Sequence, residues 1–244
     1  MATKKMYFLL SMLLSMLGAK AYAYDFEFIN AEGVTIYYNY INDGTELEVT
    51  RKDNHTSYSG SVVIPEEVIY MGKTRKVTSI GDYAFNQCRS LTSVTIPNSV
   101  TSIGVSAFFG CSALTSVTIG SGTSDIYYNA FAKCKNLKNV YCYAENVPST
   151  DARAFDNCPM EDATLHVPDA SINLYKTTEP WKSFKEMVAL TDSDPNPSGI
   201  FATEAPNDNK SIVYDLNGRV VTNSHKGINI ILMDNGTTKK VVVK

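Results

Sequence analysis

Five cysteines and three histidines are the residues of this sequence with the greatest capacity for chemistry. Four cysteines recur at intervals of 23, 23 and 24 residues, and the fifth is Cys142. Thiols can form disulfides, bind zinc or act as nucleophiles, but zinc sites usually need paired Cys-x-x-Cys or Cys/His groups, which are missing here. The spacing indicates one repeat position at which buried thiols pack as small apolar residues: Cys88, Cys111, Cys134 and Cys158. One disulfide that includes Cys142 is the alternative.

The histidines give little support for catalysis. His55, His166 and His225 lie in different parts of the chain, and none belongs to a metalloprotease, serine-hydrolase or phosphate-binding motif. A nucleophile couple of His166 with Cys142 or Asp162 would require these residues to meet in the fold. An exposed surface histidine is the simpler interpretation. The sequence therefore predicts a protein that is not an enzyme and has no cofactor and no metal site, with an unrecognised hydrolase site as a remote alternative.

The regular cysteines belong to a repeat that fills residues 77–167. Two copies agree almost throughout: VTSIGDYAFNQCRSLTSVTIP begins at Val77, and VTSIGVSAFFGCSALTSVTIG begins at Val100. A third and a fourth copy are looser but keep the Ala-Phe pair, the cysteine and the later apolar residues. A period in the twenties is typical of a leucine-rich-repeat solenoid, whose units stack on one another.

Each repeat is expected to supply one short strand and one packed loop. The alternation of Val94, Thr95 and Ile96 is that of a half-buried strand. A single repeat cannot bury its own apolar residues, so we expect about four to five stacked turns that cover one another. The equivalent phenylalanines should form one ladder inside the convex side: Phe85, Phe108, Phe131 and Phe155.

The pattern VTSIG-x-x-AF-x-x-C-x-x-LTSVTIP resembles the BspA-like leucine-rich repeats of proteins exported by Gram-negative gut and oral bacteria. The third copy departs from it by carrying Tyr141-Cys142-Tyr143 in place of Thr-Ile-Pro, and the fourth inserts a residue before Leu165. The resemblance implies a mainly β solenoid with short irregular or helical segments. It also implies a non-catalytic role in protein binding or adhesion, since BspA-like proteins include host-matrix adhesins. A host extracellular-matrix or surface protein would then be the ligand.

The start of the chain predicts export. Residues 1–23 combine Lys4 and Lys5, an apolar run and the small-x-small end Ala21-Tyr22-Ala23, which is typical of a signal peptide cleaved after Ala23. No later apolar run is long enough to hold the chain in a membrane. From Tyr24 onward the chain has 19 Lys and Arg against 25 Asp and Glu, a formal charge of −6. This charge argues against nucleic acid as a partner. We expect an exported monomer at the cell surface, in association with the outer membrane, or secreted.

Further segments are expected to close the solenoid, which we place at 61–168. Residues 24–60 alternate around Asp43-Gly44, which predicts a β-hairpin cap, and Met71-Gly72 predicts a second small hairpin. Residues 169–190 are a C-terminal cap, with Asp169 as the N-cap of a short helix. Trp181 is expected to lie across the last turn. Residues 191–199, TDSDPNPSG, are a linker by composition.

Residues 200–244 are predicted to form a small β module. Asn217-Gly218 and Asp234-Asn-Gly236 are hairpin turn signals between apolar runs. The ending YDLNGR…KG…KKVVVK resembles the C-terminal sorting domain of type IX secretion cargo, although it is shorter than that domain usually is. The alternative is a small β module without a sorting role.

The outward positions of the predicted strands are the candidate binding site. They form two ladders, and the end near Tyr141, Tyr143 and His166 is the more suggestive part, because tyrosine offers contact area and a polar tip at low entropic cost. A solvated sheet surface is the alternative. A second hypothesis is a carbohydrate-binding or periplasmic accessory protein that stacks sugars on Tyr127, Tyr128, Tyr141 and Trp181. The ladder residues are: Ser93, Ser116 and Asn139 in one, and Thr95, Thr118, Tyr141 and His166 in the other.

Overall fold

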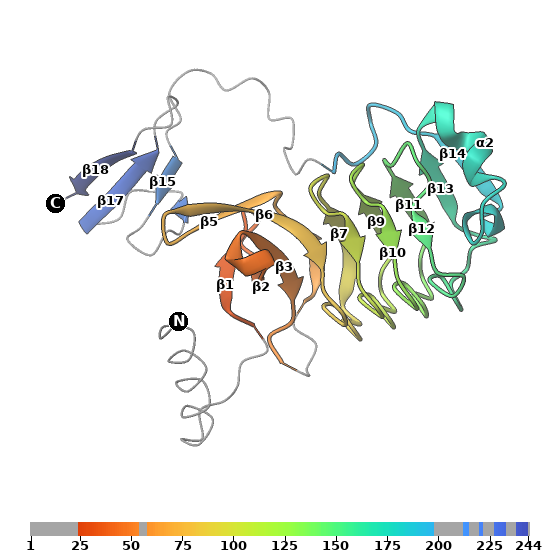
Figure 1. Cartoon of the computed structure of the whole chain (residues 1–244), viewed down its shortest axis with the longest axis horizontal. Helices are drawn as coiled ribbons and strands as arrows, with labels where there is room; N and C mark the ends of the chain where they lie inside the picture. Colours follow the sequence, from red (N-terminus) through yellow and green to blue (C-terminus); the bar gives the residue numbers. More distant parts are fainter. Residues whose placement is uncertain are drawn as a thin grey trace.

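The structure is a computed structural model that describes residues 24–53 and 58–197, together with four strands between Ile212 and Val243. The predicted signal peptide, His55 and His225 lie outside the described residues. Residues 24–197 form an elongated stack of turns, with the N-terminal hairpin at one end and the short helices at the other (Figure 1).

Each repeat forms two strands, whereas the sequence pattern predicted one. The expected strand pairs in parallel with its equivalents to form a six-stranded sheet, named sheet B here, in the order β14-β13-β11-β9-β7-β4. Its strands are β4 (Gly60–Val63), β7 (Leu91–Ile96), β9 (Ser116–Ile119), β11 (Asn139–Cys142), β13 (Thr164–Val167) and β14 (Glu186–Ala189).

The second strand of each repeat comes from the VTSI segment or from its equivalent in the later repeats, and it belongs to a second, eight-stranded sheet, named sheet A here. Ile80, Ile103 and Ile126 are aligned in parallel pairs and completely or almost completely buried. In each later strand only two residues form backbone pairs, because the chain then enters a tight turn. A strand of two residues is too short to be recognised by its periodicity. The strands are β6 (Lys73–Ile80), β8 (Ser102–Ile103), β10 (Asp125–Ile126) and β12 (Ser149–Thr150).

The turn that carries the Ala-Phe pair places residues in the left-handed backbone region at two repeating positions. One position lies two residues before each of the first three phenylalanines, and the other lies two residues after each phenylalanine. Non-glycine residues rarely adopt this conformation, and Gly110 fits it without strain. The residues are Tyr83, Ser106 and Asn129 at the first position, with φ of 59°, 53° and 56°, and Gln87, Gly110, Lys133 and Asn157 at the second, with φ of 59°, 71°, 62° and 60°.

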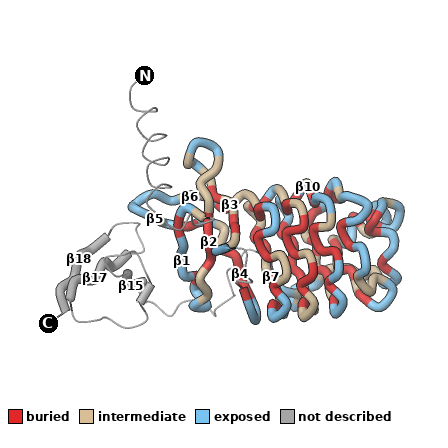
Figure 2. Tube along the Cα trace, turned by 90° about the horizontal axis from the view of Figure 1, so that it is seen from below, coloured by how far each residue is buried: buried red, intermediate tan, exposed pale blue. Residues whose placement is uncertain are grey.

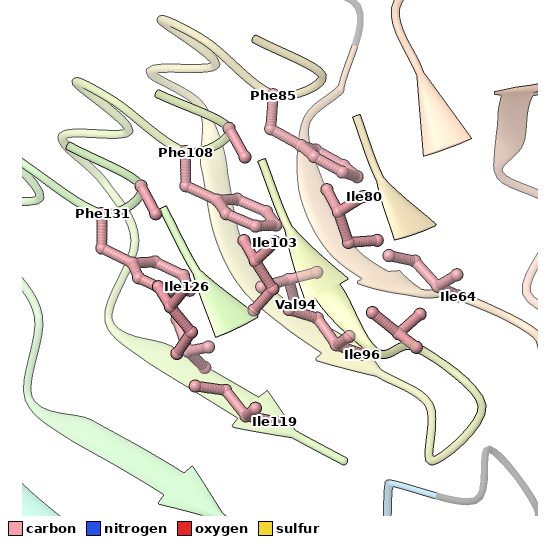
Figure 3. Close-up of a cluster of buried hydrophobic side chains, with 14 of the residues drawn as sticks. Ile64, Ile80, Phe85, Val94, Ile96, Ile103, Phe108, Ile119, Ile126 and Phe131 are labelled. Atoms are coloured by element: carbon pink, nitrogen blue, oxygen red, sulfur yellow. The ribbon is translucent and has the colours of Figure 1, made fainter. Parts of the chain in front are cut away.

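The predicted phenylalanine ladder is present and continues into both caps. Phe85, Phe108 and Phe131 stack with ring centroids 4.7 and 5.1 Å apart, and Phe131 stacks on Phe155 at 5.3 Å. Figure 3 shows the first three rings lined up beside the isoleucines of both sheets. The inside of each solenoid repeat is buried, whereas the loops that connect its strands are exposed (Figure 2). The ladder is thus the continuous core that ties the repeats together.

The regular cysteines also point into the core, as predicted. The Cys111 thiol donates to the Phe85 carbonyl oxygen at 3.0 Å, and Cys134 and Cys158 repeat this contact one and two turns later. All five cysteines lie in the described part of the chain, and none is joined to another in a disulfide. Hydrogen bonding with the neighbouring Cys111 and Cys158 thiols, followed by burial, holds the pKa of Cys134 well above its usual range. Its thiol is therefore unreactive at neutral pH.

A hairpin covers the N-terminal end of the solenoid. β2 and β3 pair antiparallel around Asp43-Gly44, and β3 then pairs in parallel with β6. The ring of Tyr58 lies 4.3 Å from that of Phe85, tilted by 32°, and the Tyr58 hydroxyl donates to the Thr50 carbonyl at 2.6 Å, so Tyr58 begins the aromatic ladder. The second predicted hairpin, at Met71-Gly72, joins β5 and β6. The strands are β1 (Phe26–Ile29), β2 (Thr35–Ile41), β3 (Glu46–Thr50) and β5 (Glu67–Tyr70), with η1 (Asn42–Gly44).

The C-terminal end is closed by short helices and by β14. Trp181 is fully buried against Phe155 and donates from Nε1 to Thr150 Oγ1 at 3.0 Å. Tyr175 is also buried and donates to the Ala144 carbonyl at 2.8 Å. The prediction that Asp169 caps a helix was wrong: Asp169 is the first residue of a 3-10 helix, and Pro168 precedes it as N-cap. The helical segments are η2 (Asp169–Ser171), α2 (Ile172–Tyr175) and η3 (Trp181–Ser183).

The C-terminal residues contain an antiparallel four-stranded sheet. β15 pairs with β16 on either side of the predicted Asn217-Gly218 turn, and β17 pairs with β18. β15 also pairs with β17, which gives the order β16-β15-β17-β18. Both predicted turns lie outside the described residues. The strands are β15 (Ile212–Tyr214), β16 (Val220–Val221), β17 (Gly227–Leu232) and β18 (Thr238–Val243).

Candidate functional site

Sheet B aligns all the outward positions that the sequence pattern proposed for binding. Ser93, Ser116 and Asn139 are successive partners in the parallel register. The second ladder is aligned in the same way, and Tyr141 pairs with Thr118 on one side and with His166 on the other. Its members, in order, are Thr95, Thr118, Tyr141 and His166. These side chains are half-buried, apart from Thr118, which is only 2% exposed. The outward face of sheet B is therefore partly accessible along both ladders, except at Thr118.

Three of these residues form one cluster. The rings of Tyr141 and His166 are 4.2 Å apart and tilted by 31°. His166 Nε2 lies 3.4 Å from Asn139 Oδ1, at the long end of hydrogen-bond distance. Burial lowers the pKa of His166, and the nearby carboxylates of Asp194 and Glu186 partly oppose that shift. The imidazole is therefore neutral at neutral pH and presents an aromatic, polar surface.

The proposed couple of His166 with Cys142 does not form, because the two side chains lie on opposite faces of sheet B. Cys142 follows Tyr141 in β11, and successive strand residues alternate sides. Its thiol is fully buried and lies 3.2 Å from the Tyr175 hydroxyl. Burial raises the pKa of Cys142 to about 11. A buried, protonated thiol cannot act as a nucleophile at neutral pH. Asp162 lies exposed in the turn before β13, and the carboxylate that faces His166 is that of Asp194.

Residues 191–197, which composition assigned to a linker, turn back along the solenoid. We call Thr191–Pro197 the return segment. Asp194 shapes its turn, because one oxygen of its carboxylate accepts from the Thr191 amide at 2.8 Å and from the Thr191 hydroxyl at 3.2 Å. The Asp194 amide donates to the Thr191 carbonyl at 3.1 Å. In Figure 1 the light-blue chain after β14 runs back in the direction of β9.

The return segment meets the same cluster of outward residues. The Asp194 carboxylate lies 3.8 Å from His166 Nδ1, and the Tyr143 hydroxyl donates to the Pro195 carbonyl at 2.9 Å. Burial and the Asp194 charge raise the pKa values of both Tyr141 and Tyr143. Pro197 is buried. The chain thus places one of its own segments on the face that the sequence pattern proposed for a ligand.

A hollow of about 480 Å³ opens beside Tyr143. Tyr143 lines one side of it, and residues 121–124 and 145–147 line the rest. The lining is largely polar, and most of these residues are exposed. The size and position of this hollow allow it to receive a side chain from a molecule bound at Tyr143.

The residues proposed as sugar platforms are dispersed. Trp181 is fully buried between Phe155 and Tyr175 and cannot stack on a sugar. Tyr127 and Tyr128 are 49% and 42% exposed. They lie in the turn before Phe131, whereas Tyr141 lies in sheet B. Only the Tyr127–Tyr128 pair is therefore available as a separate aromatic surface.

Sequence reasoning missed the return segment and the role of Tyr143 in holding it. The turn-forming composition of residues 191–197, TDSDPNP, predicted the absence of regular structure, which is consistent with the observed turn. This composition contains no information about which surface the segment contacts. Among the described residues, no group of three or more His, Cys, Asp or Glu side chains is arranged to hold a metal ion. Within the same residues, no helix is long and apolar enough to cross a membrane.

Comparisons with known proteins agree with the repeat architecture. Residues 61–176 match the family described as BspA type leucine rich repeat region, in six copies. No curated protein matches the chain. A leucine-rich repeat protein from Bacteroides capillosus is 30% identical, with a TM-score of 0.46, over 54% of this chain and 93% of that one. One from Bacteroides ovatus is 29% identical, with a TM-score of 0.43, over 55% of this chain and 36% of that one.

A third solved structure, the T. pallidum leucine-rich repeat protein, is 22% identical, with a TM-score of 0.43, over 63% of this chain and 80% of its own. None of these matches is described as an enzyme. The family match covers the turns from β4 to α2, which are the turns that carry the Ala-Phe pairs, the cysteine ladder and the outward face of sheet B. Residues 61–176 therefore form a leucine-rich repeat region of the BspA type.

Proposed function

We propose that this protein is exported to the cell surface, where it binds another protein through the outward face of sheet B without catalysing a reaction. The observation that carries the proposal is the cluster of Asn139, Tyr141 and His166, in which two aromatic rings 4.2 Å apart face outward from a parallel sheet. Protein binding is the general role of such repeat solenoids. Adhesion to a host matrix or surface protein is the specific form of binding that we propose.

The physical properties of the face support protein binding. Its side chains project from hydrogen-bonded strands, so little conformational freedom is lost when they bind. Tyr141 and Tyr143 offer large contact areas with polar tips, as in other protein-binding surfaces. The formal charge of −6 after residue 23 disfavours nucleic acid and anionic membrane surfaces.

The test is a binding screen with the purified protein against extracellular-matrix proteins and glycans, with every hit repeated at raised salt. Tyr141→Ala should weaken a protein hit at least about tenfold, as expected for an aromatic contact at the centre of an interface. Tyr127→Ala is the matched control, because it removes the same side chain from the turn before Phe131. A protein hit that is weakened equally by both changes, or by neither, would place the site elsewhere.

A second candidate function is glycan binding at Tyr127 and Tyr128. The observation in its favour is that both rings are more than two-fifths exposed, and that Arg153 lies 5.8 Å from the Tyr128 ring centroid. Adjacent aromatic rings with a nearby guanidinium can contact both the apolar and the hydroxyl-bearing parts of a sugar. Glycan hits that are lost in Tyr127→Ala and retained in Tyr141→Ala would support this function over protein binding.

Export and sorting need separate tests. The proposed cleavage after Ala23 predicts a mature N-terminus at Tyr24, which mass spectrometry of the exported protein would detect. If residues 200–244 are a sorting domain, their deletion should change the cellular location without unfolding residues 24–197. Light scattering of the exported protein should give the mass of a monomer.

A further inference from the structure

The return segment contacts sheet B through two consecutive residues. The Asp194 carboxylate faces His166, in β13, and the Pro195 carbonyl accepts a hydrogen bond from Tyr143, directly after β11. β11 and β13 are paired, so their backbones are about 4.8 Å apart. Two consecutive residues of the return segment therefore meet two successive turns of the solenoid, with a polar contact on each.

The two contacts differ in chemistry. Tyr143 recognises a main-chain carbonyl, which every peptide offers, and His166 faces a side-chain carboxylate, which only an acidic residue offers. The Tyr141 ring lies against His166. Burial raises the pKa of Tyr141, and the charge of Asp194 raises it further. The face thus receives a turn-forming peptide with an acidic residue at one defined position.

We propose that Tyr141, Tyr143 and His166 form a binding site for a turn-forming peptide that contains an Asp-Pro step, and that Thr191–Pro197 is a built-in occupant that such a partner displaces. This inference rests on the proposed function, because it assigns a ligand chemistry to the same face of sheet B. The partner is a protein segment of this chemistry in an exposed loop.

Most of the return segment is accessible to solvent. Five of its seven residues are exposed, Asp194 is half-buried and Pro197 is buried. The hydrogen bonds between Asp194 and Thr191 lie within the segment and would survive its departure from the sheet. The C-terminal cap that precedes the segment is fixed more firmly, because Tyr175 and Trp181 are fully buried. The segment can therefore leave sheet B while the solenoid stays closed.

A partner would also have room that the return segment leaves open. The hollow of about 480 Å³ adjoins Tyr143, on the side of residues 121–124. A longer peptide anchored at Tyr143 could place a further side chain there. This extra contact gives an external partner an advantage over the tethered segment, whose effective concentration is on the order of millimolar.

The test uses the full chain and a variant in which residues 191–197 are replaced by a Gly/Ser sequence of equal length. The probe is the synthetic peptide Thr-Asp-Ser-Asp-Pro-Asn-Pro with both ends blocked, titrated to about 10 mM, because a tethered segment needs only millimolar affinity to stay bound. Binding is followed by NMR shifts of the protein amides. A second peptide, with Asn in place of the Asp before the first Pro, is the matched control.

The replaced variant should bind the probe with a saturable curve, and the wild-type chain should bind it at least threefold more weakly, because its own segment competes. Adding Tyr143→Phe to the replaced variant should weaken binding several-fold, whereas adding Tyr83→Phe, at an exposed tyrosine in the turn before Phe85, should not change it. The control peptide should bind more weakly than the probe. Equal affinity of wild type and replaced variant, no binding by the replaced variant, or no effect of Tyr143→Phe would each overturn the inference.

These outcomes are distinct from those of the screen for a protein ligand. A protein ligand that requires Tyr141 but does not compete with the probe would leave the proposed function intact and refute the peptide chemistry. Probe binding that depends on Tyr143, without any hit in the screen, would support the peptide site and leave adhesion unsupported.

Discussion

Removing a central ring of the aromatic ladder should strongly destabilise the solenoid. Phe108 is fully buried, with its ring 4.7 Å from Phe85 and 5.1 Å from Phe131, nearly parallel to both. A buried Phe→Ala change costs about 3–5 kcal/mol. The cost depends on how far the surroundings can collapse into the cavity, so the backbone next to the ring decides where in this range the variant falls.

That backbone is held in place on both sides. The Phe85 amide donates to the Ala107 carbonyl at 2.7 Å, and the Phe108 amide donates to the Ala130 carbonyl at 2.7 Å. These bonds fix the spacing of the turns, so the rings of Phe85 and Phe131 cannot close the gap. We therefore expect Phe108→Ala to lower the free energy of unfolding by about 4–5 kcal/mol, which includes the loss of two stacking contacts.

Urea denaturation followed by circular dichroism and by Trp181 fluorescence is the assay, since two probes reveal any loss of cooperativity among repeats. Phe109→Ala is the matched control: it removes the same side chain one residue later, where the ring is half-buried beneath Lys133. Phe109→Ala should lower the free energy of unfolding by less than about 2 kcal/mol, because the Phe109 ring buries less apolar area on folding than the Phe108 ring does. Equal costs for Phe108→Ala and Phe109→Ala would refute the argument that stacking between fixed turns sets the stability.

Three other outcomes are expected. Gly122→Ala should lower the free energy of unfolding by about 1–3 kcal/mol, measured in urea, because the added Cβ would overlap the Asn98 carbonyl oxygen; an unchanged midpoint would contradict this. Because burial raises the pKa of Cys142 to about 11, the folded chain keeps a proton that the unfolded chain loses at alkaline pH, so stability falls as the pH rises. Between about pH 8 and pH 10, the free energy of unfolding of the wild type should fall by about 1.4 kcal/mol more than that of Cys142→Ala. Parallel curves of unfolding free energy against pH for the two proteins would show that this thiol contributes nothing. Deletion of residues 200–244 should leave the cooperative melt of the solenoid unchanged, whereas a broadened melt would mean that the C-terminal module supports the repeats.

The sequence by itself determined the repeat and its buried positions. The period of 23 residues identifies equivalent sites, and identical residues at equivalent sites of a stack must lie above one another. This is why the Phe85–Phe155 ladder, the inward cysteines and the register of Thr95, Thr118, Tyr141 and His166 could all be predicted. The hairpin at Met71-Gly72 followed from local turn chemistry.

Only the tertiary structure decided what covers these turns. The two-residue strands β8, β10 and β12 form because the neighbouring turns present paired backbone groups, and a segment of two residues has no periodicity of its own. Tyr58 joins the aromatic ladder because the N-terminal hairpin carries it onto Phe85. In the same way, the return segment reaches Tyr143 and His166 through a turn that Asp194 closes on Thr191. Contacts of this kind depend on the path of the chain between distant residues, and a repeat period contains no information about that path.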